Sequence, residues 1–169
     1  MTTTTLGPNE TVRDAALGMI EKMRANGQQV YDSLSDDQWF AQAAPGTNHA
    51  MWIAGHLATS TGYFAEMMGG SNPAPESYHA LFDAGTEPSS DRSLYPSPAE
   101  VRAEMEKGYA ALRSALEGLS EAELAEPLSE DFQGFSRVEA ALLTLWHDSF
   151  HAGQIASVRK AQGLSPLFM

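Results

Sequence analysis

Four long stretches of the chain repeat apolar residues with the period of an α-helix, and the last of them constrains the fold most. Residues 136–163 read SRVEAALLTLWHDSFHAGQIASVRKAQG. Ser136 and Glu139 form the Ser-x-x-Glu pattern of a capping box, in which each side chain bonds the backbone amide of the other residue. Ala, Leu, Gln and Arg favour a helical interior, and Gly163 stands where a left-handed C-terminal cap is expected. The pattern predicts one long helix over 136–163.

Two histidines in this predicted helix, His147 and His151, are four residues apart. Side chains at this spacing leave the same face of a helix, one turn from each other. Two neutral imidazoles in this arrangement could chelate one transition-metal ion. A third ligand would then have to come from another part of the fold.

Three further helices are predicted upstream. The first covers residues 9–34, the second begins at Thr47 or Asn48 and ends near residue 68, and the third covers 97–119. Ser97, Pro98 and Glu100 are together typical of a helix start. The apolar face expected for the first helix consists of Val12, Ala15, Ala16, Met19, Ile20, Met23, Val30 and Leu34.

The remaining segments predict loops with short helical turns. Residues 71–96 are rich in Pro, Ser, Gly and Asp, with one expected turn at 76–82, and a link of this length is usually functional or a long crossover. Short turns are also expected within 35–46 and 120–124. No stretch alternates like a strand for long enough to build a sheet. The expected fold is all-α, a four-helix bundle with a long crossover between helices two and three. The 169 residues suit one domain over 1–169, with residues 1–8 as a flexible lead-in.

The chain is strongly acidic, with 10 Lys plus Arg against 22 Asp plus Glu and a formal charge of -12. Such a surface repels phosphate backbones and anionic lipid, so neither nucleic acid nor a membrane is an expected partner. No cysteine is present, which excludes disulfides, thiolate metal ligands and a cysteine nucleophile. The first residues lack the pattern of a secretory signal, and the cytoplasm is the expected compartment.

His56, on the second predicted helix, is the candidate third ligand. A bundle core can hold a metal between facing helices, and three histidines with an open position are the catalytic arrangement of zinc. Imidazole also suits nickel, iron and copper. The candidate ligands are therefore His56, His147 and His151. The alternative is that they are core histidines without an ion, because a His-x-x-x-His pair also occurs by chance.

Several residues near these histidines have simpler interpretations. His49, two turns before His56, is interpreted mainly as a residue near the helix start, and His79 in the crossover is expected to face solvent. Asp148 points off the ligand face and is expected at the surface or in a helix contact. Gln154 shares the ligand stripe and could bond a ligand or another helix. Core packing is the simplest role for three aromatic residues, Trp52, Trp146 and Phe150.

Two segments resemble a known family. The sequence GHLA around His56, with Trp52 four residues earlier, resembles the second-helix motif of the DinB-like metal-binding four-helix bundles. The sequence HDSFHAGQIASVRKAQG is similar to the fourth-helix motif of that family, in which a His-x-x-x-His pair precedes a small residue, Gly, Gln and Ile. The order of the helices and the long link between helices two and three also match, so the resemblance spans nearly the whole chain.

The resemblance implies a divalent metal, zinc or nickel before iron, held by His56, His147 and His151. Relatives include thiol-dependent transferases and isomerases of the maleylpyruvate isomerase-like superfamily, in which the metal activates a low-molecular-weight thiol such as bacillithiol, mycothiol or glutathione. The implied function is a thiol S-transferase that acts on a small-molecule substrate as a homodimer. No residue is assigned as catalytic base, and His49, Tyr63 or Glu66 could serve only by reaching the pocket.

Other functions stay open at this point. A metal-dependent hydrolase would use the same ligands to activate water. A binding module without enzymatic activity would hold a small ligand in the same pocket. A structural bundle would use the ion to join helices two and four, and its fold would then depend on the metal.

Overall fold

Four long helices form the frame of the molecule in the computed structural model, which describes residues 11–128 and 134–167. They are α1 (Val12–Asp32), α2 (Ala50–Met67), α4 (Pro98–Gly118) and α6 (Arg137–Ala161). Four short helical elements lie between them: η1 (Gln38–Phe40), α3 (Glu76–Phe82), η2 (Arg92–Leu94) and α5 (Glu121–Ala125). No strand occurs in the described ranges, which confirms the all-α class, and the expected lead-in at residues 1–8 lies outside them.

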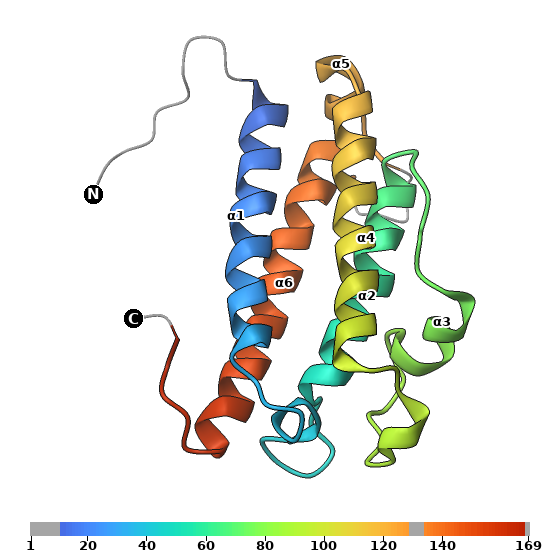
Figure 1. Cartoon of the computed structure of the whole chain (residues 1–169). Helices are drawn as coiled ribbons and strands as arrows, with labels where there is room; N and C mark the ends of the chain where they lie inside the picture. Colours follow the sequence, from blue (N-terminus) through green and yellow to red (C-terminus); the bar gives the residue numbers. More distant parts are fainter. Residues whose placement is uncertain (1–10, 129–133, 168–169) are drawn as a thin grey trace.

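The four long helices run in two parallel pairs (Figure 1). α1 and α6 run in one direction, and α2 and α4 run in the other. Because α2 and α4 are parallel, the chain between them has to return along the whole bundle, and it carries α3 and η2 on the way. α2 packs mainly against α4, and α1 packs mainly against α6. The predicted four-helix bundle with a long crossover is thus confirmed.

The ends of the helices follow the predicted caps in three places and differ in one. The capping boxes at Ser97 and Ser136 are present, and Gly163, two residues beyond the last residue of α6, has a φ of 72°. The prediction that α2 begins at Thr47 or Asn48 is wrong, because His49 is its N-cap and Nδ1 of that imidazole accepts the backbone N–H of Trp52. A histidine cap carries a weaker sequence signal than a Ser, Thr, Asp or Asn cap.

Two aromatic side chains of α6 are exposed, although core packing was predicted for them. Trp146 is 65% exposed and Phe150 is 53% exposed, and their rings stack on each other with centroids 5.9 Å apart. On α1, Val12 and Met19 are likewise exposed, while Trp52 of α2 is buried as expected. Trp146 and Phe150 are exposed because α6 carries apolar residues on more than one face, and no described helix covers the face that holds these two rings.

Side-chain contacts hold the crossover against α2, and they involve a glycine, a tryptophan and a histidine of that helix. The ring of Phe82 lies so close to Gly55 that a Cβ at this position would be 2.3 Å from it. Nε1 of Trp52 donates a 2.9 Å hydrogen bond to Oγ1 of Thr86. Nε2 of His49 donates to the backbone carbonyl of Ser89 at 3.2 Å. These contacts fix the crossover against the N-terminal half of α2, which carries His56.

The bundle contains no membrane-spanning candidate in the residues that the structure describes. None of its helices combines the length and the apolar character that crossing a bilayer requires.

Candidate metal centre

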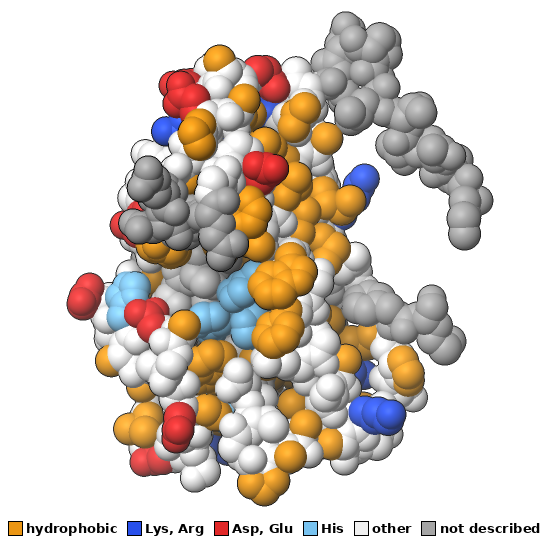
Figure 2. Space-filling view, turned by 180° about the vertical axis from the view of Figure 1, so that it is seen from behind, with side chains coloured by type: hydrophobic (Ala, Val, Ile, Leu, Met, Phe, Trp, Pro, Cys, Tyr) orange, Lys and Arg blue, Asp and Glu red, His pale blue; other side chains and the backbone are white. Residues whose placement is uncertain are grey.

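The structure brings the three candidate histidines together between α2 and α6. Nε2 of His147 lies 3.2 Å from Nε2 of His56 and 3.2 Å from Nε2 of His151. His56 and His151 are buried and His147 is half-buried. Figure 2 shows histidine side chains at the surface on this side of the molecule, beside a group of hydrophobic side chains. The i, i+4 pair on α6 and the single histidine on α2 therefore form one cluster.

Hydrogen bonds orient two of these rings from behind. Nδ1 of His56 donates to the backbone carbonyl of Phe82 at 2.8 Å, and Nδ1 of His151 donates to Oε1 of Gln154 at 2.9 Å. A neutral imidazole that carries its proton on Nδ1 has a free lone pair on Nε2. The lone pairs of both residues consequently point into the space that they share with His147. Such partners behind a ring are typical of histidines that ligate metals.

The electrostatic surroundings keep all three imidazoles neutral at pH 7. Burial, together with smaller effects of the adjacent imidazoles of His151 and His56, lowers the pKa of His147 to about 4. Burial also lowers the pKa of His151 to about 4, against the opposing effect of the Gln154 hydrogen bond. The pKa of His56 is lowered mainly by burial. Neutral imidazole is the form that binds a metal ion.

The spacing of the three nitrogens fits a transition-metal ion. With Zn–N bonds of about 2.0–2.1 Å and tetrahedral angles, two ligand nitrogens are about 3.3 Å apart. The two observed separations of 3.2 Å agree with that value. Three uncharged ligands also leave the full charge of a divalent ion available to a fourth ligand. The donor set present therefore fits a divalent metal.

Aromatic rings enclose the cluster. The indole of Trp52 stacks on the ring of His56 with centroids 4.9 Å apart and an interplanar angle of 13°. Phe64 contacts His147 edge to face at 6.2 Å, and Phe150 contacts His151 edge to face at 5.3 Å. These rings restrict water around the nitrogens and hold the imidazoles in place.

A pocket of about 330 Å³ adjoins His56 and contains a second imidazole. It is lined by side chains of α2 and the crossover, namely His56, Thr59, Ser60, Tyr63, Asn72, His79, Asp83 and Ala84. Nδ1 of His79 lies 3.1 and 3.0 Å from the two carboxylate oxygens of Asp83. His79 was expected to face solvent; it is half-buried instead, because α3 packs on α2. The i, i+4 spacing of His79 and Asp83 was the sequence signal for this pair.

Other singled-out residues have structural roles. His49 caps α2 and does not line the pocket described above, and neither does Glu66, whereas Tyr63 does. Asp148 is buried in a helix contact, where Oη of Tyr109 on α4 donates to its Oδ2 at 2.6 Å. The helix-contact interpretation of Asp148 is confirmed and the surface interpretation is wrong. Burial raises the pKa of Asp148 to about 6, against the opposing effect of the Tyr109 hydrogen bond.

Comparisons with solved structures agree with this fold. A conserved protein from Enterococcus faecalis matches with a TM-score of 0.73 at 14% identity, over 91% of this chain and 99% of the other. YfiT from Bacillus subtilis, described as a probable metal-dependent hydrolase with an unusual four-helix bundle topology, matches with a TM-score of 0.65 at 15% identity, over 98% of this chain and 94% of the other. A search of curated proteins gives no match.

A family comparison covers most of the bundle and the whole histidine cluster. The family model described as the DinB superfamily matches residues 19–155, which include His56, His147 and His151. This span is well over half of the 169 residues and contains the GHLA segment and the His-x-x-x-His-x-Gly-Gln-Ile part of the second segment, which ends at residue 155. The chain therefore belongs to the DinB superfamily.

Proposed function

We propose that this protein is a metal-dependent enzyme in which His56, His147 and His151 hold one divalent ion, zinc or nickel before iron. The observation that carries the proposal is the convergence of three neutral imidazoles, in which Nε2 of His147 lies 3.2 Å from Nε2 of both His56 and His151 and the Nδ1 atoms of those two rings are hydrogen-bonded. A divalent ion in this position supplies Lewis acidity that lowers the pKa of a thiol or a water molecule. The proposed reaction is the transfer of a low-molecular-weight thiol to a small electrophilic substrate.

The side chains around the cluster support this chemistry. Gln154 and the carbonyl of Phe82 keep the protons of His151 and His56 on Nδ1, away from the site. The walls formed by Trp52, Phe64 and Phe150 offer an apolar surface for the carbon skeleton of a substrate. The reaction needs a pool of reduced thiols, which is a property of the cytoplasm, the compartment that we propose.

We assign proton transfer to His79. The carboxylate of Asp83 accepts the Nδ1–H of His79 and leaves its Nε2 free to take a proton from a thiol or water in the pocket that His56 also lines. A base oriented by a carboxylate is a recurrent arrangement in catalysis. No carboxylate belongs to the histidine cluster itself among the described residues, so His79 is the candidate base with the best support.

Hydrolysis is the second candidate function. YfiT, whose fold this chain shares, is described as a probable metal-dependent hydrolase. The same ligands would serve a reaction in which water replaces the thiol. The two functions differ in one requirement, because a transferase needs an added thiol and a hydrolase does not.

We also propose that the protein is a homodimer. The exposed apolar residues of α6, Leu142, Trp146 and Phe150, lie on a face that no described helix covers. Exposed apolar groups of this kind, rich in aromatic rings, mark interaction surfaces. A second copy that covers this face would bury Phe150 next to the histidine cluster.

The first experiment measures metal content in the protein purified without a chelating tag, with His147→Ala beside it. Near-stoichiometric zinc, nickel or iron in the wild type, lost in His147→Ala, supports the site; no metal in either protein after reconstitution contradicts it. The loaded protein is then assayed with an electrophilic reporter with and without bacillithiol, mycothiol or glutathione. Turnover that requires the thiol supports the transferase, whereas turnover of an ester or amide without thiol supports the hydrolase.

A second measurement separates an enzyme from a structural metal protein. Removal of the ion with a chelator should leave the helical content and cooperative unfolding intact if the ion is catalytic. Loss of the fold together with the ion would indicate a structural role instead.

A further inference from the structure

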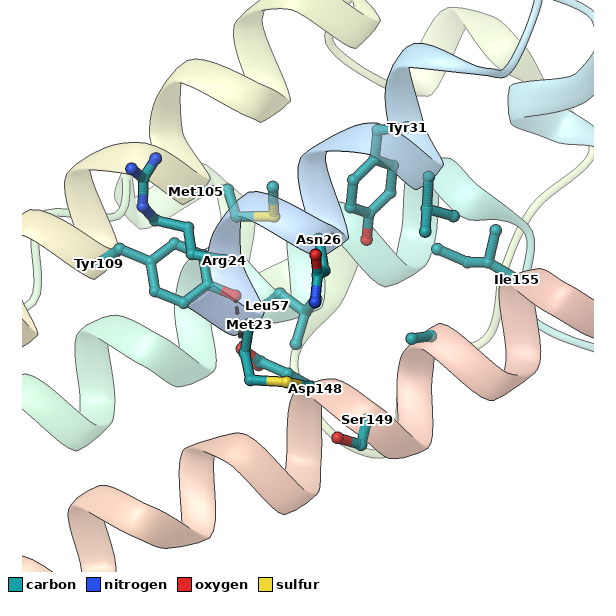
Figure 3. A pocket seen from close by; sticks show the side chains of 13 residues that line it. Met23, Arg24, Asn26, Tyr31, Leu57, Met105, Tyr109, Asp148, Ser149 and Ile155 are labelled. Atoms are coloured by element: carbon teal, nitrogen blue, oxygen red, sulfur yellow. Dashed lines mark hydrogen bonds between the residues drawn. The ribbon is translucent and has the colours of Figure 1, made fainter. Parts of the chain in front are cut away.

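A second cavity lies inside the bundle between α1, α4 and α6 (Figure 3). Its volume is about 220 Å³. Most of its wall is apolar and comes from Met23, Val30, Leu57, Met105 and Ile155. An apolar cavity of about 150 Å³ in another protein holds benzene, so this one has room for a small organic molecule. The methionine side chains can adjust to the shape of a ligand.

Three oxygen-bearing side chains point into this apolar space. Figure 3 shows Tyr109 from α4 and Asp148 from α6 directed at each other, with the hydroxyl of Tyr31 from α1 nearby. Oη of Tyr109 donates to Oδ2 of Asp148 at 2.6 Å. Oδ1 of Asp148 and Oη of Tyr31 are buried and have no hydrogen-bond partner among the described residues. Buried oxygens without partners are costly and point to a missing hydrogen-bond partner, which for the carboxylate oxygen of Asp148 is a donor.

The carboxylate of Asp148 in this cavity also lacks a paired cation. Asp148 is 9% exposed and Tyr31 is 3% exposed, so both lie away from bulk water. Arg24 is the cationic residue among those that line the cavity, and it is already paired with Glu21 at 3.0 Å and Glu106 at 2.5 Å. A buried carboxylate is stabilised by a nearby cation, and within the described residues none pairs with Asp148.

We propose that this cavity binds a small primary amine as its ammonium ion. Three acceptors, Oδ1 of Asp148 and the hydroxyl oxygens of Tyr31 and Tyr109, match the three N–H donors of a primary ammonium group. The apolar wall takes a short alkyl body. The cavity is smaller than the roughly 300–1,000 Å³ of pockets for drug-sized ligands, which limits the ligand to a few carbon atoms.

A ligand can reach the cavity from the surface between α1 and α6. Asn26 and Ser149 line the cavity and are exposed. Gly27 and Ala152 also line it and present little side chain. These residues form the mouth of the cavity at the surface.

The amine site is independent of the proposed metal site. Asp148 follows His147 in the chain, but its side chain contacts Tyr109 of α4, whereas the imidazole of His147 meets His56 of α2. An amine could also ligate a metal ion, so the test uses metal-free protein. Failure of the amine site then leaves the metal-centre proposal untouched, and the reverse also holds.

Isothermal titration of metal-free protein with n-butylamine, n-butanol and butyrate at pH 7 tests the proposal. Butylammonium should bind at one site, at least about tenfold more tightly than butanol, because its hydrogen bonds are charge-assisted. Butyrate should not bind, because it would meet the carboxylate of Asp148. His147→Ala should bind butylammonium like the wild type.

Variants locate the site. Asp148→Asn should weaken butylammonium binding by at least about tenfold, and Tyr31→Phe should weaken it by a smaller factor. Ser149→Ala is the matched control at the cavity mouth, since its hydroxyl bonds the backbone of Leu145 within α6, and it should bind normally. If Asp148→Asn fails to fold, the butylammonium affinity of Tyr31→Phe tests the proposal in its place. Equal binding of butanol and butylammonium, no binding of either, or unchanged affinity in both variants would overturn the proposal and leave a cavity filled by water.

Discussion

Gln154 accepts the Nδ1–H of His151 at 2.9 Å, one turn further along α6. This contact fixes the proton of His151 on the far side of its ring, and Asn48 contacts the same amide oxygen at 3.5 Å. We predict that Gln154→Leu lowers the affinity for the metal by about 10- to 100-fold, because the ring loses the acceptor that sets its tautomer. Titration against a chromophoric chelator measures this change.

Two further variants control the Gln154 experiment. Gln154→Glu restores an acceptor and should restore the affinity. Ser157→Ala, which alters an exposed side chain one turn away on α6, should bind metal like the wild type. An unchanged affinity in Gln154→Leu would mean that the hydrogen bond does not position the ligand.

His79→Gln should reduce kcat by about 100-fold or more, because it removes the base that we assign to the pocket beside His56. Asp83→Asn should cause a smaller loss, since it only removes the carboxylate that orients His79. The metal content of both variants should equal that of the wild type. Wild-type kcat in His79→Gln would contradict the assignment, and a loss of metal would indicate that His79 supports the ligands.

The unfolding free energy should depend on pH through His49. Burial lowers the pKa of this imidazole, whose Nδ1 must stay unprotonated to accept the Trp52 amide. Below the unfolded value of about 6.5, the unfolded chain binds the proton more tightly, so stability falls as the pH falls from there towards the folded pKa. His49→Asn keeps a capping side chain that does not titrate.

Urea unfolding of the wild type and His49→Asn, both metal-free, measures this difference. The other histidines contribute equally to both proteins. The wild type should be more stable by about 1–2 kcal/mol at pH 7.5, because the variant loses the hydrogen bond to Ser89. The difference in unfolding free energy between the two proteins should decrease towards pH 5.5. A difference that stays constant with pH would exclude His49 as the titrating group.

Gly55→Ala should destabilise the protein by about 1–3 kcal/mol through overpacking. A Cβ at this position would lie 2.3–2.5 Å from atoms of the Phe82 ring, and Phe82 would have to move together with the carbonyl that orients His56. Gly18→Ala on α1 is the control, because a Cβ there meets nothing within 4 Å. It should be stabilising by about 1 kcal/mol through helix propensity. Thermal unfolding of both variants shows whether Gly55→Ala lowers the stability while Gly18→Ala raises it.

Trp146→Glu should dissociate the proposed homodimer. A buried tryptophan at the centre of an interface contributes about 2 kcal/mol or more, so the dissociation constant should rise at least about 30-fold. Leu94→Glu is the control, because Leu94 is also exposed but lies on η2. Sedimentation velocity measures the oligomeric state of both variants, and only Trp146→Glu should sediment as a monomer. A wild type that sediments as a monomer would contradict the proposal.

Local sequence signals predicted the helices and the cluster of histidines well. Ser97, Ser136 and Gly163 mark helix ends through hydrogen bonds or backbone conformations that involve only near neighbours, and all three predictions were confirmed. The stripe positions of His56, His147 and His151 follow from helical periodicity. Their convergence needed the packing of α2 beside α6, which the family resemblance supplied.

The less successful predictions concern which face of a helix is covered. Trp146 and Phe150 have core-like side chains, and no local property of α6 shows that their face has no partner within the described bundle. The pairing of Tyr109 with Asp148, 39 residues later, depends on how α4 and α6 meet. Positions of this kind are set by tertiary packing, which the pattern of a single helix does not contain.

The two parallel helix pairs also determine when the fold can form. α1 packs mainly against α6, so the first helix of the chain meets its main partner only after the last helix has been made. Contacts between segments so distant in sequence slow folding relative to a bundle of consecutive hairpins. During synthesis on the ribosome, the apolar side of α1 can be buried against α6 only after nearly the whole chain has emerged. Residues 137–161 thus complete both the histidine cluster and the folding of the N-terminal helix.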